Sequence, residues 1–165
     1  MAQPAWRVES TPPDHPVAAQ LIDELSAELA ERYKVVWPSS DGRTNYVPAD
    51  FDPITDAFLV GYLGDDATCC GALRRFDDTK VEIKRMFVRP AHRGSGIGRR
   101  MLDALEGEAA RLGYAAVVLE TGSEQPEALG LYASAGYGLV APWPPYDERP
   151  YARCYAKDLR QRSQM

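Results

Sequence analysis

The sequence predicts an α/β fold of the α+β kind, in which helices flank a mixed central sheet of about six to seven strands. Three observations support this prediction. Three strand-like segments follow one another across short turns, which indicates an antiparallel meander. A strand, a glycine-rich loop, a helix and another strand come next, which indicates a right-handed parallel crossover. The chain has 165 residues, 45% of them hydrophobic, and no evident linker, which favours one domain over residues 1–165.

The first third of the chain predicts one strand, one helix and one long connection. The strand covers residues 6–9, and the proline-rich segment 11–16 then supplies a helix start. Apolar residues at helical spacing from Val17 to Tyr33, with acidic residues on the other faces, predict an amphipathic helix. Residues 34–53 are predicted to be mostly irregular, and a long loop in a compact domain is often a binding loop.

The other elements follow from alternating apolar patterns separated by turn residues. Two helices are expected to begin at Ile97 and Pro126 and to be stopped by Gly113 and Gly136. The proline-rich segment 141–150 is predicted to be a loop. Strands are predicted at residues 57–63, 69–76, 81–88, 115–120, 137–140 and 151–157, with the parallel crossover between 81–88 and 115–120.

The charge distribution limits the classes of ligand. A net charge of −5 argues against a general nucleic-acid-binding protein, which carries a basic excess to neutralise phosphates. No stretch approaches the roughly 20 apolar residues that cross a bilayer, so we expect no membrane association. One short stretch of this acidic chain is basic, and an anionic ligand is expected there: Lys84, Arg85, Arg89, Arg93, Arg99 and Arg100.

The cysteines, Cys69, Cys70 and Cys154, show neither metal-ligand spacing nor a Cys-x-x-Cys pattern. We therefore expect reduced, buried thiols in a cytoplasmic protein, and no metal.

The segment Arg93-Gly94-Ser95-Gly96-Ile97-Gly98 is the strongest functional signal. Its glycines let backbone N–H groups face one concavity, and the next helix adds its unpaired N–H groups, which suits a phosphate or diphosphate. An ordinary tight connection is the alternative. A Walker-type loop is excluded because Gly-Lys-Ser/Thr is absent, and a dinucleotide fingerprint is disfavoured because Arg99 stands where its third glycine belongs.

This loop and a second segment resemble the GNAT acyltransferases. The loop matches that family's Arg/Gln-x-x-Gly-x-Gly/Ala signature and follows a strand that ends at residues 84–90. Residues 125–137 resemble the family's Asn-x-x-Ala-x-x-Leu-Tyr-x-x-x-Gly-Phe/Tyr segment. The resemblance covers residues 57–159 well and the first 56 residues only in outline. It implies a GNAT-type fold and an acetyl-CoA-dependent N-acetyltransferase, in which a primary amine of a small molecule or peptide attacks the thioester directly.

The resemblance also implies which residues hold acetyl-CoA. The diphosphate would rest on the loop N–H groups, and the pantetheine arm would pair with backbone of the preceding strand. Gln125 stands where the family has asparagine, which puts that contact in doubt. The residues implied to bind the cofactor are Met86, Phe87, Val88, Arg93, Gly94, Ser95, Gly96, Ile97, Gly98, Arg99 and Gln125.

Two catalytic residues are implied in the same way. Glu82 matches the place where several family members carry a glutamate base, although it could equally be a solvent-facing glutamate paired with Lys80 or Lys84, and water-relayed deprotonation is another route. Tyr132 matches a tyrosine that protonates the leaving thiolate, with a core aromatic residue as the alternative. Glu120, at the end of its strand, is expected either to orient an amine or to cap the next turn.

The acceptor is less constrained. It is expected beside the first helix, the loop around Trp37, Tyr46 and Phe51, and segment 142–146. Acidic residues there favour a cationic acceptor: Asp41, Asp50, Asp52 and Asp147. Two other functions stay open, a non-catalytic acyl-CoA-binding or sensor module and an NAD(P)-binding oxidoreductase. Homodimers are common in the family, but the sequence identifies no interface.

Overall fold

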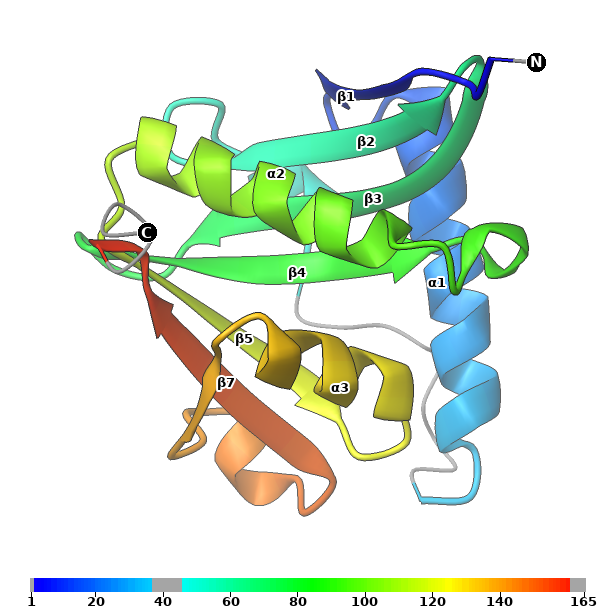
Figure 1. Cartoon of the computed structure of the whole chain (residues 1–165). Helices are drawn as coiled ribbons and strands as arrows, with labels where there is room; N and C mark the ends of the chain where they lie inside the picture. The colour runs from blue at the N-terminus through cyan, green and yellow to red at the C-terminus, as the bar shows by residue number, and fades with distance from the viewer. Residues whose placement is uncertain (1, 37–45, 161–165) are drawn as a thin grey trace.

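The computed structural model describes residues 2–36 and 46–160, and in this part of the chain one mixed sheet of seven strands is flanked by helices (Figure 1). The strand order is β1-β2-β3-β4-β5-β7-β6. The strands are β1 (Trp6–Ser10), β2 (Ala57–Leu63), β3 (Asp66–Arg75), β4 (Lys80–Val88), β5 (Ala116–Gly122), β6 (Gly138–Val140) and β7 (Ala152–Asp158). The α-helices are α1 (Pro16–Tyr33), α2 (Ile97–Arg111) and α3 (Pro126–Ser134). The predicted fold class, with its meander and its parallel crossover from β4 to β5, is confirmed.

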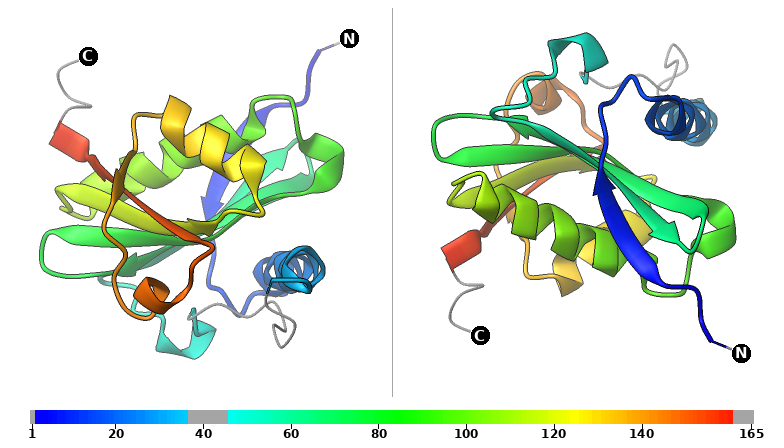
Figure 2. Two further views of the ribbon diagram at one scale, coloured as in Figure 1. Left: turned by 90° about the horizontal axis from the view of Figure 1, so that it is seen from below. Right: turned by 90° about the horizontal axis from the view of Figure 1, so that it is seen from above.

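Helices cover both faces of the sheet. Figure 2 shows α2 and α3 on one face and α1 on the other. Each layer encloses its own apolar core: Met101 and Leu105 of α2 pack on the first face, and Leu21 of α1 packs with Phe58 of β2 on the second. All four side chains are fully buried, so both helical layers gain stability from burial of apolar surface.

The parallel pairing of β4 with β5 is short. It runs from Lys80 opposite Ala116 to Ile83 opposite Leu119, and beyond these residues the two strands separate. On its other edge β4 stays paired with β3, but the register shifts between Cys70 and Ala72. The last part of β4 therefore keeps one edge without a strand partner, next to the start of α2 and α3.

A β-bulge at Arg85 accompanies this separation. Arg85 has a φ of 54°, in the left-handed region. The extra residue reverses the alternation of side chains along β4. Ile83, Met86 and Val88 therefore contribute to the core beneath α2, whereas Phe87 packs in the core beneath α1.

Several boundaries differ from the prediction. β3 begins at Asp66 rather than residue 69, because the turn at Gly64, with a φ of 59°, places Asp66 directly opposite Leu63. Short 3₁₀ helices lie outside the predicted strands and helices: Pro48–Asp50, Pro90–His92 and Tyr146–Glu148. Residues 37–45 of the predicted long connection lie outside the described part of the chain. No helix among the described residues is long and apolar enough to span a bilayer.

Candidate functional site

A cavity of about 270 Å³ opens beyond the last paired residues of β4 and β5. Its walls come from the free end of β4, the loop before α2, the first turns of α2 and α3, and the middle of α1. The lining residues are Leu25, Glu28, Met86, Phe87, Val88, His92, Arg93, Gly94, Gly96, Ile97, Gly98, Arg99, Gln125, Glu127, Ala128, Leu131 and Tyr132. The structure thus brings together most of the residues that the sequence analysis assigned to the cofactor.

The glycine loop forms the polar end of this cavity. Gly94 and Gly96 have φ values of 81° and 83°, which favour glycine, and a Cβ at either would meet no atom within 4 Å. Gly96 is also the N-cap of α2, where no side chain caps the helix. Ser95 is turned away, because its hydroxyl donates to the carbonyl oxygen of His92 at 2.8 Å. An open loop at an uncapped helix N-terminus fits a phosphate or diphosphate.

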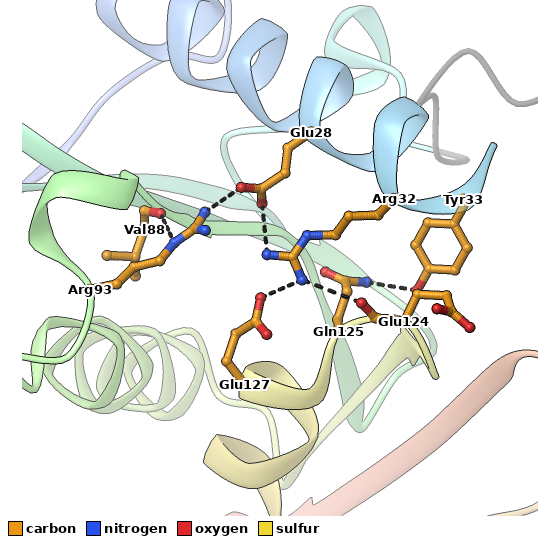
Figure 3. Close-up of polar contacts among 8 residues, drawn as sticks. All are labelled: Glu28, Arg32, Tyr33, Val88, Arg93, Glu124, Gln125 and Glu127. Atoms are coloured by element: carbon orange, nitrogen blue, oxygen red, sulfur yellow. Dashed lines mark hydrogen bonds and ion pairs between the residues drawn. The ribbon is translucent and has the colours of Figure 1, made fainter. Parts of the chain in front are cut away.

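The two arginines of the loop line the cavity, and each of them pairs with a carboxylate. Arg93 was expected among the cofactor-binding residues, and its guanidinium points towards α1 (Figure 3). Its Nε donates to the carbonyl oxygen of Val88 at 2.9 Å, and its Nη2 donates to Glu28 at 2.7 Å. Arg99 lies 3.6 Å from Asp103 in an exposed pair. Backbone N–H groups at the start of α2 therefore add positive potential to the glycine loop beside these paired arginines.

Tyr132 of α3 lines the cavity and also belongs to the core. Its ring lies 5.7 Å from that of Tyr137 and 6.3 Å from that of Tyr155. Burial raises the pKa of Tyr132 above the ordinary tyrosine value, and the carboxylate of Glu120 raises it further. The hydroxyl is therefore protonated at neutral pH and can donate a proton or a hydrogen bond.

Glu82 lies outside the lining of this cavity, on the side of the sheet that carries α1. Its carboxylate is buried rather than solvent-facing: Oε1 accepts a hydrogen bond from Arg74 at 2.8 Å, and Oε2 lies 3.6 Å from Nζ of Lys84. Lys84 also contacts the hydroxyl of Tyr146, and burial lowers the pKa of this lysine. Glu82 is thus part of a buried polar cluster on the opposite side of the sheet from α3.

Glu120 extends this cluster to the point where the strands separate. Glu82 pairs with Val118, so Glu120, two residues further along β5, lies on the same face of the sheet. It is the first residue of β5 past the last pair with β4. Burial raises the pKa of Glu120, and nearby Lys84 offsets part of the increase. A half-buried carboxylate with a raised pKa is well suited to accept a proton from an amine.

Other predicted residues are less central. Gln125 donates to the hydroxyl of Tyr33 at 3.2 Å, so its side chain contacts α1.

The residues expected around the acceptor are spread over several places. Tyr46 is buried in the core under α1, and Asp52 accepts from the N–H of Ile54 in a local turn. Asp50 and Asp147 are exposed, and Trp37 and Asp41 lie outside the described residues. Trp143 packs with Tyr146 in a small core beside β7.

Among residues 2–36 and 46–160, no three His, Cys, Asp or Glu side chains gather as a metal site would require.

The first helix was expected beside the acceptor, but its contribution to the cofactor cavity was not predicted. Glu28 lines the cavity, and Arg32 connects Glu28 to Glu127 of α3 and to the carbonyl oxygen of Glu124 (Figure 3). The spacing of Glu24, Glu28 and Arg32 by four residues places them on one face of the helix. That spacing was the available signal, but it does not reveal what the face contacts.

Comparisons with known proteins agree with this architecture. Residues 22–137 match the model of the acetyltransferase (GNAT) family. An IAA acetyltransferase of Azospirillum brasilense is 34% identical over 152 residues, which cover 85% of this chain and 89% of the relative.

Solved structures show the same fold. A protein of Klebsiella pneumoniae subsp. pneumoniae assigned to the acyl-CoA N-acyltransferases has a TM-score of 0.76 and 27% identity, covering 93% of this chain and 97% of its own. A GNAT family acetyltransferase of Elizabethkingia anophelis, solved with acetyl-CoA bound, has a TM-score of 0.65 and 17% identity, covering 93% and 97%.

Proposed function

Because this chain belongs to the GNAT family of acetyltransferases, we propose that it transfers an acetyl group from acetyl-CoA to a primary amine of a small molecule or peptide. The observation that carries the proposal is the cavity at the separated ends of β4 and β5, which joins an open glycine loop to a buried tyrosine. Acetyl-CoA would supply the acetyl group as a thioester, which is already activated towards an amine.

The walls of the cavity suit such a donor. The polar end offers the N–H groups of residues 93–99 to a diphosphate. Apolar walls come from Leu25, Met86, Ala128 and Leu131, beside the backbone edge of β4 that lacks a strand partner. An arm that combines methylene groups with amides can bury the first and pair the second with such an edge.

Two sets of side chains would handle protons. The hydroxyl of Tyr132 would donate a proton to the departing thiolate, since a phenol is protonated at neutral pH. On the other face of the sheet, Glu82 and Glu120 are candidate bases for the attacking amine. Glu82 accepts a hydrogen bond from Arg74 and lies 3.6 Å from Lys84. Burial raises the pKa of Glu120. The variants of both residues are therefore compared.

Thiol release from acetyl-CoA tests the function. The purified protein would be mixed with acetyl-CoA and pools of amino acids, polyamines, aminoglycosides or peptides, with IAA added because the Azospirillum relative is named for it. Glu82→Gln, Glu120→Gln and Tyr132→Phe would be assayed in parallel. Release that requires one pool and falls in Tyr132→Phe and in at least one glutamate variant supports the proposal. Tight acetyl-CoA binding without release in any pool favours a non-catalytic acyl-CoA-binding module.

A further inference from the structure

Glu28 of α1 occupies a central place in the wall of the cavity. Its side chain is 24% exposed, and each of its carboxylate oxygens faces a different arginine. Oε1 accepts a hydrogen bond from Nη2 of Arg93 at 2.7 Å, and Oε2 lies 3.7 Å from Nη2 of Arg32. Figure 3 shows the carboxylate between the two guanidinium groups.

The two arginines lead to opposite walls of the cavity. Arg93 donates to the carbonyl oxygen of Val88, the last residue of β4, at 2.9 Å. Arg32 pairs with Glu127 in the first turn of α3 and donates to the carbonyl oxygen of Glu124 at 3.3 Å. One carboxylate thus connects the end of β4 with the beginning of α3, across the region where no strand pairing joins β4 to β5.

We propose that Glu28 is a positioning residue that fixes the separation of these two walls, and thereby the width of the space available to the arm of the acyl donor. The inference rests on the proposed function, since it concerns the donor cavity. It also gives Arg93 a different role from the one implied by the sequence. Arg93 fixes the carbonyl group at the end of β4 and the position of α1, and it is not a direct phosphate ligand.

The chain provides a matched control one helical turn earlier. Glu24 of α1 forms a comparable ion pair, with Arg89 at 2.7 and 3.1 Å. Arg89 also donates to the carbonyl oxygen of Ala67 at 2.8 Å, which lies in β3. The Glu24 pair therefore connects α1 to the β3–β4 side alone, and Glu24 does not line the cavity. Glu24→Gln and Glu28→Gln remove the same charge from the same helix, but only Glu28→Gln removes the connection across the cavity.

Two ligands distinguish the contribution of the pantetheine arm to binding from that of the phosphates. Isothermal titration calorimetry would measure acetyl-CoA and 3′-phospho-ADP, the fragment of the donor that lacks the pantetheine arm. We expect Glu28→Gln to weaken acetyl-CoA binding by about tenfold, which corresponds to about 1.4 kcal/mol, and to leave 3′-phospho-ADP binding unchanged. Glu24→Gln should leave both affinities unchanged. Arg32→Gln, which breaks the connection on the α3 side, should behave like Glu28→Gln, and it serves as the test if Glu28→Gln does not fold.

Other results would overturn the inference. If Glu28 acted only through its charge, its removal beside an anion-binding loop would tighten the binding of both ligands. If Arg93 were a direct phosphate ligand, Arg93→Gln would weaken both ligands equally. Unchanged acetyl-CoA binding in both Glu28→Gln and Arg32→Gln would also exclude a positioning role. Failure of the wild-type protein to bind acetyl-CoA would instead contradict the proposed function, so the two ideas fail in different ways.

Discussion

Glu106 of α2 and Lys157 of β7 form a part-buried ion pair, with Nζ of the lysine 3.0 Å from Oε1 of the glutamate. The hydroxyl of Tyr137 donates to the same carboxylate at 2.8 Å. The Glu106 side chain is only 2% exposed, so its charge depends on these partners. The pair connects β7 to α2, the helix that follows the glycine loop.

We therefore expect Lys157→Met to lower the free energy of unfolding by about 3 kcal/mol, because it leaves a buried carboxylate without its counter-charge. Urea denaturation measures the change. The double variant Glu106→Gln with Lys157→Met should be more stable than Lys157→Met alone. A loss below about 1 kcal/mol in the single variant would show that the pair behaves like an exposed one.

Tyr132→Phe should lower kcat by about a hundredfold and leave the KM for acetyl-CoA nearly unchanged, because the hydroxyl is proposed to act in the transition state. The raised pKa of Tyr132 further predicts no loss of wild-type activity from its ionisation in mildly alkaline solution. Steady-state thiol release over a pH series measures both effects. Tyr155→Phe is the control, since this neighbouring ring does not line the cavity. If Tyr132→Phe turned over as fast as the control Tyr155→Phe, Tyr132 would have no role in the mechanism.

Glu120→Gln should stabilise the fold near neutral pH. Burial raises the pKa of Glu120 in the folded state, so its ionised form is less favourable there than in the unfolded chain. This cost is present above the folded-state pKa and disappears as the pH falls below the ordinary glutamate value of about 4.3. Thermal unfolding from about pH 5 to about pH 8 should show a Tm difference between variant and wild type that grows with pH. Glu124→Gln, an exposed residue nearby, should show no such trend.

Substitutions of two glycines should separate stability from donor binding. Gly96→Ala places a side chain at a φ of 83°, which costs about 1–2 kcal/mol of stability. Gly98→Ala lies in the first turn of α2, where alanine is favoured over glycine by about 0.5–1 kcal/mol. Its Cβ would lie 3.4 Å from Leu131 and 3.7 Å from Val88, both in the cavity wall. Gly98→Ala should therefore keep or raise Tm and still weaken acetyl-CoA binding, and a variant that binds normally would contradict this placement of the donor.

The sequence was sufficient for those parts of the fold that depend on local pattern. The strands of the meander, the crossover and the glycine loop follow from alternation, helical spacing and turn residues. The bulge at Arg85 could not be predicted, because nothing local marks the one residue that reverses the pattern of β4. The early start of β3 was missed because Asp66 is a poor strand former that is paired by a tight turn.

The candidate site was predictable to a similar extent. The glycine loop was recognisable because its function depends on backbone conformation, which glycine reveals directly. The partner of Arg93 was not, because Glu28 is separated from it by 65 residues and no local rule connects them. The partner of Glu82 was equally unpredictable, because Arg74 donates its hydrogen bond from the neighbouring strand β3. Side chains that act through long-range contacts require the three-dimensional structure.

The short contact between β4 and β5 also has a mechanical consequence. Four residue pairs join the half of the sheet formed by β1 to β4 to the half formed by β5 to β7. Native-state hydrogen exchange should detect the two halves as separate units, with the lowest protection where they meet. A ligand that contacts both β4 and α3 would connect the two halves of the sheet and restrict their separation. A bound ligand would then slow amide hydrogen exchange along the whole β4–β5 pairing, including residues that it does not contact.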